Sequence, residues 1–274
     1  MNGKKIRLAL IQMDCKIIDK NNNHNHALDF LDKVKMKTDI ACFPEFFTTG
    51  YNLNIIGDKL YDLAETIPGK TTKMLGKKAK EKRLAIVGTI VEKDILREGI
   101  LYNTAFVIDK DGRLVGKYRK FYLYPPEHCY FRPGSELPIF DLGITKVGIA
   151  ICYDHAFPEL FRVLALKGAE IVFIPSAVPQ GYEYLLNLRT RARAQDNQFF
   201  VAAINRVGQE GQVKYCGLSK IINPRGEVIA EASLDKEEIV YCKVDINQIL
   251  QERKQEPILR SLRSEIYKRW FNLL

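Results

Sequence analysis

A cysteine at the end of a buried strand is the residue in this sequence best placed to do chemistry. Residues 146–151 read KVGIAI, an apolar run that is typical of a strand buried on both faces. Cys152 follows at once, and Pro158 is well placed in the first turn of a helix that starts near residue 157. Ligands of open α/β sheets bind at this end of the strands, and a helix N-terminus favours a thiolate. The pattern therefore predicts that Cys152 is a nucleophile.

A nucleophilic cysteine needs a base for its proton and a group that stabilises the oxyanion. Three further residues have suitable types and settings. Glu45 follows a predicted strand at 39–43, Lys120 follows one at 113–118, and Glu127 lies in the loop PPEHCYF. Each residue alone is more often a core thiol or a solvated charge, so the interpretation depends on the four occurring together.

The elements that must position these residues are strands and helices in alternation, which favours an α/β fold. Residues 119–136 predict a loop rich in aromatic residues and proline. The patterning predicts strands at 5–13, 39–43, 84–93, 100–109, 113–118, 137–141, 146–151, 170–175, 199–206, 215–222, 227–232 and 238–244, and helices at 19–37, 70–83, 157–167 and 182–197.

Three short segments recur in the same order along the chain, which predicts two similar α/β halves packed as one domain over residues 1–250. In this scheme Cys152 and Glu45 lie at the ends of sibling strands in opposite halves, and a pseudo-twofold brings them together. The matched pairs are KIRLALI (5–11) with KVGIAIC (146–152), TDIACFP (38–44) with AEIVFIP (169–175), and VIDKDGRLVG (107–116) with IINPRGEVIA (221–230).

The order of the motifs resembles the carbon–nitrogen hydrolase, or nitrilase, superfamily, and the likeness covers nearly the whole chain. This resemblance implies a four-layer αββα sandwich, a catalytic triad of Glu45, Lys120 and Cys152, and an assisting Glu127. The motifs are FPE…GY (43–51), YRK (118–120), PPE (125–127), ICYDHAFPE (151–159), IPSA (174–177), RARAQDNQFFVAAINRVG (191–208) and the hairpin INPRGEVIAEA.

The resemblance also implies hydrolysis of a non-peptide linear C–N bond. A thioester or S-carbamoyl intermediate would form, ammonia or an amine would leave, and neither a metal nor an organic cofactor is called for. Nitrilases proper usually read Cys-Trp-Glu at the nucleophile, whereas this chain reads Cys152-Tyr153-Asp154, which favours amide or N-carbamoyl substrates. Nitrile hydrolysis and a catalytically retired binding module are the alternatives, and the intact set of four residues favours an enzyme.

The candidate substrate-binding residues lie in loops around Cys152. Hydrolases of N-carbamoyl-D-amino acids carry arginines where this chain has His155 and Ala156. Glu183, in the loop after residue 175, either receives a substrate amine or is a surface charge. Tyr122, Tyr124, Tyr130 and Phe131 either line the entrance or simply pack. The predicted substrate-binding set is Tyr51, Tyr124, Tyr153, His155, Ser176, Ala177 and Glu183.

The composition excludes several other classes. The 274 residues are 46% hydrophobic and 27% charged, which suits a large core, and no apolar run approaches the roughly 18 residues of a membrane span. The N-terminus lacks a signal-peptide pattern, and six scattered cysteines without CxxC pairs suit a reducing cytoplasm better than disulfides or zinc. We interpret the NNNHNH tract, with His24 and His26, as a polar helix-entry loop rather than a metal site. The net charge of +9 comes without a nucleic-acid motif and is interpreted as lysines that aid solubility.

The C-terminal tail, 251–274, places apolar residues among basic ones and predicts self-association. Residues 259, 262, 266 and 270 have helical spacing, so part of the tail is expected to be an amphipathic helix. The alternative is that the tail folds back on its own domain. Members of the resembled family usually pair through the helices beside the nucleophile and through C-terminal arms, so we expect at least a homodimer. The apolar residues are Ile258, Leu259, Leu262, Ile266, Tyr267, Trp270 and Phe271.

Overall fold

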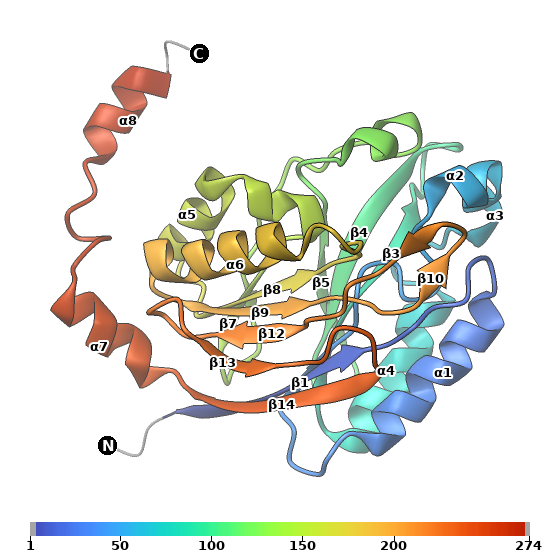
Figure 1. The fold of residues 1–274 in the computed structure, drawn as a ribbon, viewed down its shortest axis with the longest axis horizontal. Coiled ribbons are helices and arrows are strands. Elements are labelled where there is room, and N and C mark those ends of the chain that lie inside the picture. Colours follow the sequence, from blue (N-terminus) through green and yellow to red (C-terminus); the bar gives the residue numbers. More distant parts are fainter. Residues whose placement is uncertain (1–3, 272–274) are drawn as a thin grey trace.

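Two six-stranded sheets lie face to face between two layers of helices in the computed structural model (Figure 1), which describes residues 4–271 apart from the side chains of Lys268, Trp270 and Phe271. The first sheet has the order β14-β1-β2-β3-β4-β5, with β14 (Glu238–Asp245), β1 (Lys5–Gln12), β2 (Ile40–Cys42), β3 (Ala85–Lys93), β4 (Leu101–Ile108) and β5 (Leu114–Arg119). The second has the order β13-β12-β9-β8-β7-β6, with β13 (Val228–Glu231), β12 (Lys220–Ile222), β9 (Phe200–Ile204), β8 (Ile171–Pro175), β7 (Lys146–Ile149) and β6 (Phe140–Asp141).

The layers follow from central strands that are apolar on both faces. In β1, Leu10 faces the second sheet, while Ile11 packs against α1 (Lys20–Lys33) and α4 (Lys70–Lys82). In β8, Phe173 faces the first sheet, while Val172 packs against α5 (Pro158–Leu166) and α6 (Glu183–Asn197). Alternate side chains of one strand thus bury against a sheet and against helices. The predicted αββα sandwich is confirmed.

The two halves have the same topology, as the repeated segments predicted. Parallel strands β1, β2 and β3 continue into antiparallel β4 and β5, and parallel strands β7, β8 and β9 continue into antiparallel β12 and β13. At the edges, β14 and β6 pair antiparallel with the equivalent strands β1 and β7.

One detail of the repeat was wrong, because Glu45 and Cys152 do not follow sibling strands. Glu45 follows β2, whose counterpart is β8, and β8 is followed by Ser176. Cys152 follows β7, the counterpart of β1. The sibling ends do meet across the pseudo-twofold, since the Glu45 N–H donates to the Ser176 carbonyl at 3.3 Å. Glu45 is therefore placed by β2, which is the neighbour of β1 and not the counterpart of the strand that precedes Cys152.

Several predicted boundaries also differ. The NNNHNH tract lies inside α1 rather than in an entry loop, because the Asp19 carboxylate caps the helix by accepting from the Asn22 N–H at 3.0 Å. The strand predicted at 215–222 narrows to β12, because Gly217 and Leu218 have φ of 54° and 55°. The strand predicted at 137–141 narrows to β6, and α1 ends at Lys33. Short elements that the patterning missed are α2 (Leu53–Ile56), η1 (Gly57–Lys59), α3 (Leu60–Leu63), η2 (Pro125–Cys129), η3 (Cys152–Ala156), β10 (Gln209–Glu210) and β11 (Val213–Lys214).

The tail forms α7 (Asn247–Gln255) and α8 (Ser264–Phe271), and Figure 1 shows α8 standing clear of the two sheets. The predicted apolar side chains of Trp270 and Phe271 lie outside the described part. No helix within residues 4–271 is both long and apolar enough to cross a membrane. In the same residues, no group of three or more His, Cys, Asp or Glu is arranged to hold a metal ion.

Candidate active site

Cys152 lies in a sharp turn at the end of the second sheet. It is the first residue of the 3-10 turn η3, and its φ of 43° is in the left-handed region that residues other than glycine rarely adopt. We predicted that Cys152 lies near the N-terminus of a helix. This was wrong, because the helix α5 begins only at Pro158. Strained backbone of this kind is concentrated at functional sites, where the surrounding structure holds it in place.

Asp154 holds this turn in place. Its Oδ2 accepts from the Ile151 N–H at 2.7 Å and from the Tyr118 hydroxyl at 2.8 Å, and its Oδ1 accepts from the Tyr122 N–H at 2.8 Å. Burial raises the pKa of Asp154 to about 6. The turn that carries Cys152 is thereby fastened to β5 and to the loop that follows Lys120.

Lys120 lies between the two carboxylates that the sequence singled out. Its Nζ is 2.9 Å from Glu45 Oε1 and 2.8 Å from Glu127 Oε2. Asn103 of β4 closes the cluster, because its Nδ2 donates to Oε1 of each carboxylate at 2.8 Å. All four side chains are inaccessible to solvent. Sequence reasoning missed Asn103, whose signal was one amide side chain within the apolar strand at residues 101–108.

The buried charges shift the ionisation of the site. Burial and the neighbouring Glu127 raise the pKa of Glu45, against the opposing pull of Lys120. Burial lowers the pKa of Lys120, but the two carboxylates outweigh it, so this pKa lies above its usual range. Burial and Glu45 raise the pKa of Cys152 well above that of a free thiol, although Lys120 and the Ala177 N–H oppose this. This direction favours a protonated thiol at rest, which needs a base to take its proton.

Glu45 has one oxygen free to accept a proton. Its Oε1 is occupied by Lys120 and Asn103, whereas its buried Oε2 has no hydrogen-bond partner. A buried carboxylate oxygen without a donor is unusual and is often a sign of function. It suits a base that acts on a group close by.

A cavity of about 340 Å³ opens onto Cys152. The candidates Tyr51, Tyr124, Tyr153, His155 and Ala177 all line it. The other lining residues are Asn52, Leu53, Asn54, Pro126, Val178, Pro179, Tyr182, Leu185, Arg189, Val213 and Tyr215.

Two of the predicted binding residues lie off the cavity wall. The buried Ser176 hydroxyl donates to the Ile174 carbonyl at 3.2 Å, so its side chain is used within its own strand end. The Glu183 carboxylate accepts from the Gly181 N–H at 2.8 Å and holds the turn before α6. The structure therefore brings neither carboxylate nor hydroxyl from these residues to the cavity.

Most of the aromatic loop packs instead of lining the entrance. Of the four aromatic residues predicted there, only Tyr124 lines the cavity. Tyr122 stacks on Phe157, with ring centroids 3.6 Å apart, and Phe131 packs on Phe46 at 5.6 Å. Tyr130 packs against the same cluster of apolar residues as Phe131. These rings fix the loop that carries Glu127.

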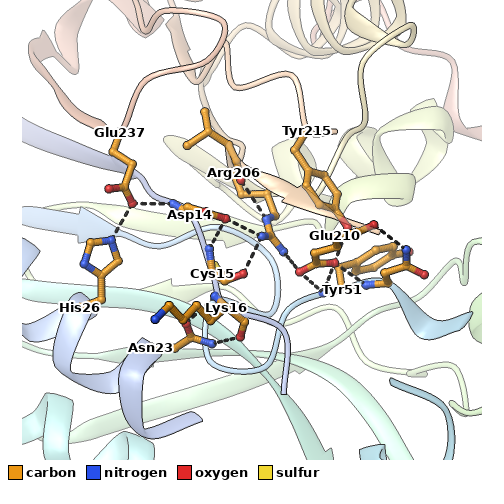
Figure 2. Close-up of polar contacts among 12 residues, drawn as sticks. Asp14, Cys15, Lys16, Asn23, His26, Tyr51, Arg206, Glu210, Tyr215 and Glu237 are labelled. Carbon is orange, nitrogen blue, oxygen red and sulfur yellow. Dashed lines mark hydrogen bonds and ion pairs between the residues drawn. The ribbon is translucent and has the colours of Figure 1, made fainter. Parts of the chain in front are cut away.

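Glu210 fastens one wall of the cavity, as Figure 2 shows. Its carboxylate accepts from the backbone N–H groups of Tyr51 at 3.1 Å and Asn52 at 2.7 Å, and from the Tyr215 hydroxyl at 2.7 Å. Tyr51, Asn52 and Tyr215 all line the cavity. One carboxylate thus sets the position of two segments that are far apart in the sequence.

The charge of Glu210 is balanced by the fully buried Arg206. The same guanidinium donates to Asp14 Oδ1 at 3.0 Å and to the Cys15 carbonyl at 2.9 Å. Its plane also lies over the Tyr215 ring, 4.2 Å from the centroid. Since Arg206 follows β9 and Asp14 follows β1, this network ties the two halves together beside the cavity.

We expect Glu210→Gln to lower the free energy of unfolding by about 3 kcal/mol, because it leaves the charge of Arg206 poorly compensated in a buried site. Denaturant unfolding measures this change. Glu237→Gln is the matched control: Glu237 accepts from the Asp14 N–H at 2.8 Å but is partly exposed, so its loss should cost less than about 1 kcal/mol. Equal losses in the two variants would contradict the importance given to the buried network.

A profile of the carbon–nitrogen hydrolase family matches residues 7–254. The chain belongs to the carbon–nitrogen hydrolase family. It is 34% identical over 272 residues to a nitrilase of Pyrococcus abyssi, covering 96% of this chain and 100% of that protein. It is 35% identical over 280 residues to an omega-amidase of Homo sapiens, covering 95% of this chain and 96% of that protein.

The structure is also similar to that of a carbon–nitrogen hydrolase from Helicobacter pylori. The TM-score is 0.90 at 27% sequence identity, with 98% of this chain and 99% of that chain covered. Identity, fold and coverage therefore agree over nearly the whole chain. The family and the hydrolase class predicted from the motifs are confirmed.

Proposed function

We propose that this carbon–nitrogen hydrolase is an amidase that uses Cys152 as its nucleophile and forms an acyl-enzyme. The observation that carries this proposal is the buried cluster of Glu45, Lys120 and Glu127 near a strained cysteine that lines a cavity. The human relative is an omega-amidase, and that name supports an amide substrate. The Tyr153-Asp154 pair after the nucleophile likewise favours amides over nitriles.

In the first step the free Oε2 of Glu45 takes the thiol proton, and the sulfur of Cys152 attacks the amide carbonyl carbon. Lys120 Nζ lies within 2.9 Å of Glu45 Oε1 and of both carboxylate oxygens of Glu127. One of its three N–H groups turns to the oxyanion as negative charge develops there. The Tyr153 N–H is the second donor. As the C–N bond breaks, Glu45 returns its proton to the nitrogen, and ammonia leaves a thioester on Cys152.

In the second step water cleaves the thioester. Glu45, assisted by Glu127, takes a proton from water while the hydroxyl adds to the thioester carbon. Collapse breaks the C–S bond, the carboxylic acid leaves, and the sulfur regains its proton. The raised pKa of Glu45 suits this double duty, because a group that both accepts and donates a proton works best with a pKa near the operating pH.

Ammonia release from a substrate panel tests the proposal. The panel compares linear primary amides, N-carbamoyl compounds and nitriles of equal chain length, because all three present a carbon that a thiolate attacks. We expect primary amides to have the highest kcat/KM and nitriles the lowest. Turnover of nitriles alone, or of no compound by the folded enzyme, would overturn the proposal.

We also propose that the protein is at least a homodimer, joined through α5, α6 and the tail. The helix α5 exposes Val163 and Leu166, and the helix α6 exposes Leu188. Both helices cover the sheet that leads to the nucleophile turn, and α8 stands clear of its own sandwich (Figure 1).

A chain that ends at Glu256 keeps α7 and the Gln198 Nε2 contact to the Glu256 carbonyl at 2.6 Å, but lacks the rest of the tail. We expect the full chain to scatter light as a dimer or larger at micromolar concentration. The shortened chain should show a lower mass or dissociate on dilution. A monomeric full chain would contradict the proposal.

A reducing, cytoplasmic location is part of the proposal. All six cysteines are free thiols. Cys15, Cys42 and Cys216 are buried, and Cys242 lies in β14. Such usage suits a compartment that keeps thiols reduced, as a cysteine nucleophile requires.

A further inference from the structure

Asn103 is the one neutral side chain, among the described residues, that bonds to both carboxylates of the active-site cluster. Its Nδ2 donates to Oε1 of Glu45 and to Oε1 of Glu127, each at 2.8 Å. Lys120 Nζ donates to the same two oxygens at 2.9 Å. The Asn103 backbone carbonyl accepts from the Lys120 N–H at 2.8 Å. One residue of β4 therefore contacts all three charged residues of the cluster.

The orientation of this amide leaves a buried acceptor unused. Asn103 is fully buried, and its Oδ1 has no hydrogen-bond partner in the described part of the chain. The reverse orientation is excluded, because it would place Oδ1 against two carboxylate oxygens. A buried acceptor without a donor destabilises the folded state, and an amide that is kept in spite of this is often functional.

The Asn103 amide also defines which oxygen of Glu45 is free. Since Asn103 and Lys120 both engage Oε1 of Glu45, its Oε2 is left without a partner. Glu127 differs, because its Oε2 accepts from the Tyr124 N–H at 2.6 Å and lies 2.8 Å from Lys120 Nζ. Without the amide, either oxygen of Glu45 would serve equally as the partner of Lys120. The base would then lose its fixed orientation.

The same amide affects the ionisation of Glu45. Burial is the main cause of the raised pKa of this carboxyl, and Glu127 adds to it. Lys120 and the hydrogen bond from Asn103 oppose the rise. The Cys152 thiol also faces Glu45, and burial followed by Glu45 raises the pKa of this thiol. Because Glu127 shares the charge of Lys120, the neutral donor is needed to limit the pKa of Glu45 further.

We propose that Asn103 is a positioning residue for the hydrolysis: it holds Glu45 with Oε2 free to take the Cys152 proton, and it keeps both carboxylates on Lys120. It acts through Glu45 and Glu127, and it does not line the cavity. Its loss therefore affects kcat and the pH profile more than KM. This inference rests on the proposed amidase function.

The test compares the unaltered full-length protein with Asn103→Val and Asn103→Ala, which both remove the amide. Valine suits a strand, and alanine avoids any overpacking. Thr104→Val is the matched control, because Thr104 is the next residue of β4 and its buried hydroxyl donates at 2.6 Å to Glu92, a carboxylate outside the site. Thermal unfolding verifies the fold of each variant.

Two readouts are measured across a range of pH. The first is steady-state kcat and KM for butanamide, a small linear primary amide. The second is the rate at which iodoacetamide alkylates Cys152, followed by peptide mass spectrometry. This second readout reports the removal of the thiol proton and needs no turnover.

We expect both Asn103 variants to lower kcat by about 10- to 100-fold, the range for a lost hydrogen bond to a charged group, with KM nearly unchanged. The acidic limbs of kcat/KM and of the alkylation rate should move about one pH unit to higher pH, because Glu45 then holds a proton more tightly. Thr104→Val should lose stability and keep both profiles.

The two levels of the argument fail differently. Folded Asn103 variants with the kcat and pH profiles of the unaltered enzyme would overturn the role of Asn103 and leave the amidase intact. Loss of activity in parallel with Thr104→Val, or failure of both Asn103 variants to fold, would show that Asn103 serves stability alone and would also overturn it. If the folded unaltered enzyme hydrolyses no amide, the amidase proposal fails, and the alkylation profiles still decide whether Asn103 acts on Glu45.

Discussion

Cys152→Ala will fold and will lower kcat for amide hydrolysis by about 10⁴-fold or more, the size of loss seen when a nucleophile is removed from a group of residues that act as a unit. The thiol lies in a strained turn held by Asp154, and alanine keeps the Cβ that this turn carries. Ammonia release measures the loss, and circular dichroism with thermal unfolding reports the fold.

Cys129→Ala is the matched control for this variant, because Cys129 is exposed and does not line the cavity. It should retain full activity. Residual turnover above one hundredth in folded Cys152→Ala would show that the nucleophile lies elsewhere.

Lys120→Met will lower kcat/KM by about 10³-fold. The change removes a donor to the oxyanion, which by itself is worth about 10²- to 10³-fold. It also leaves Glu45 and Glu127 as like charges in a site without solvent, so one of them will hold a proton at neutral pH. Besides the fall in rate, the pH–rate profile should shift to higher pH.

Lys117→Met is the matched control, since Lys117 lies in β5, the strand that Lys120 directly follows. It pairs with Glu92, which Arg119 also binds. It removes an amine that contacts a buried carboxylate without touching the site. Its kcat/KM and pH profile should stay close to those of the unaltered enzyme. If both lysine variants lose activity in parallel with stability, Lys120 is structural and the mechanism is wrong.

The sequence predicted the parts of the site that depend on strand ends. Cys152 and Glu45 were found because an apolar strand that stops at a polar residue is a local signal. The expected position of Cys152 at the N-terminus of a helix was wrong, because a 3-10 turn separates Cys152 from Pro158. The repeat predicted the pseudo-twofold correctly, but it could not tell which neighbouring strand would deliver Glu45.

Residues that act through three-dimensional surroundings gave no usable signal. Asn103 is one polar residue in an apolar strand, a pattern that usually marks a satisfied core amide. Arg189 lines the cavity, but it is one of three arginines within five residues of α6, and the sequence does not distinguish it from the others. Tyr122 and Phe131 are aromatic residues of the same loop as Tyr124, but they pack on Phe157 and Phe46, which are distant in the chain.

The central claim is that the acyl group of an amide is carried on Cys152 during turnover. Acid quenching in the steady state, followed by peptide mass spectrometry, tests it directly. The peptide that contains Cys152 should gain the mass of the substrate minus ammonia, the gain should vanish once substrate is exhausted, and Cys152→Ala should never show it. Product formation with no adduct on Cys152, or with an adduct on another residue that decays at the rate of turnover, would contradict the account.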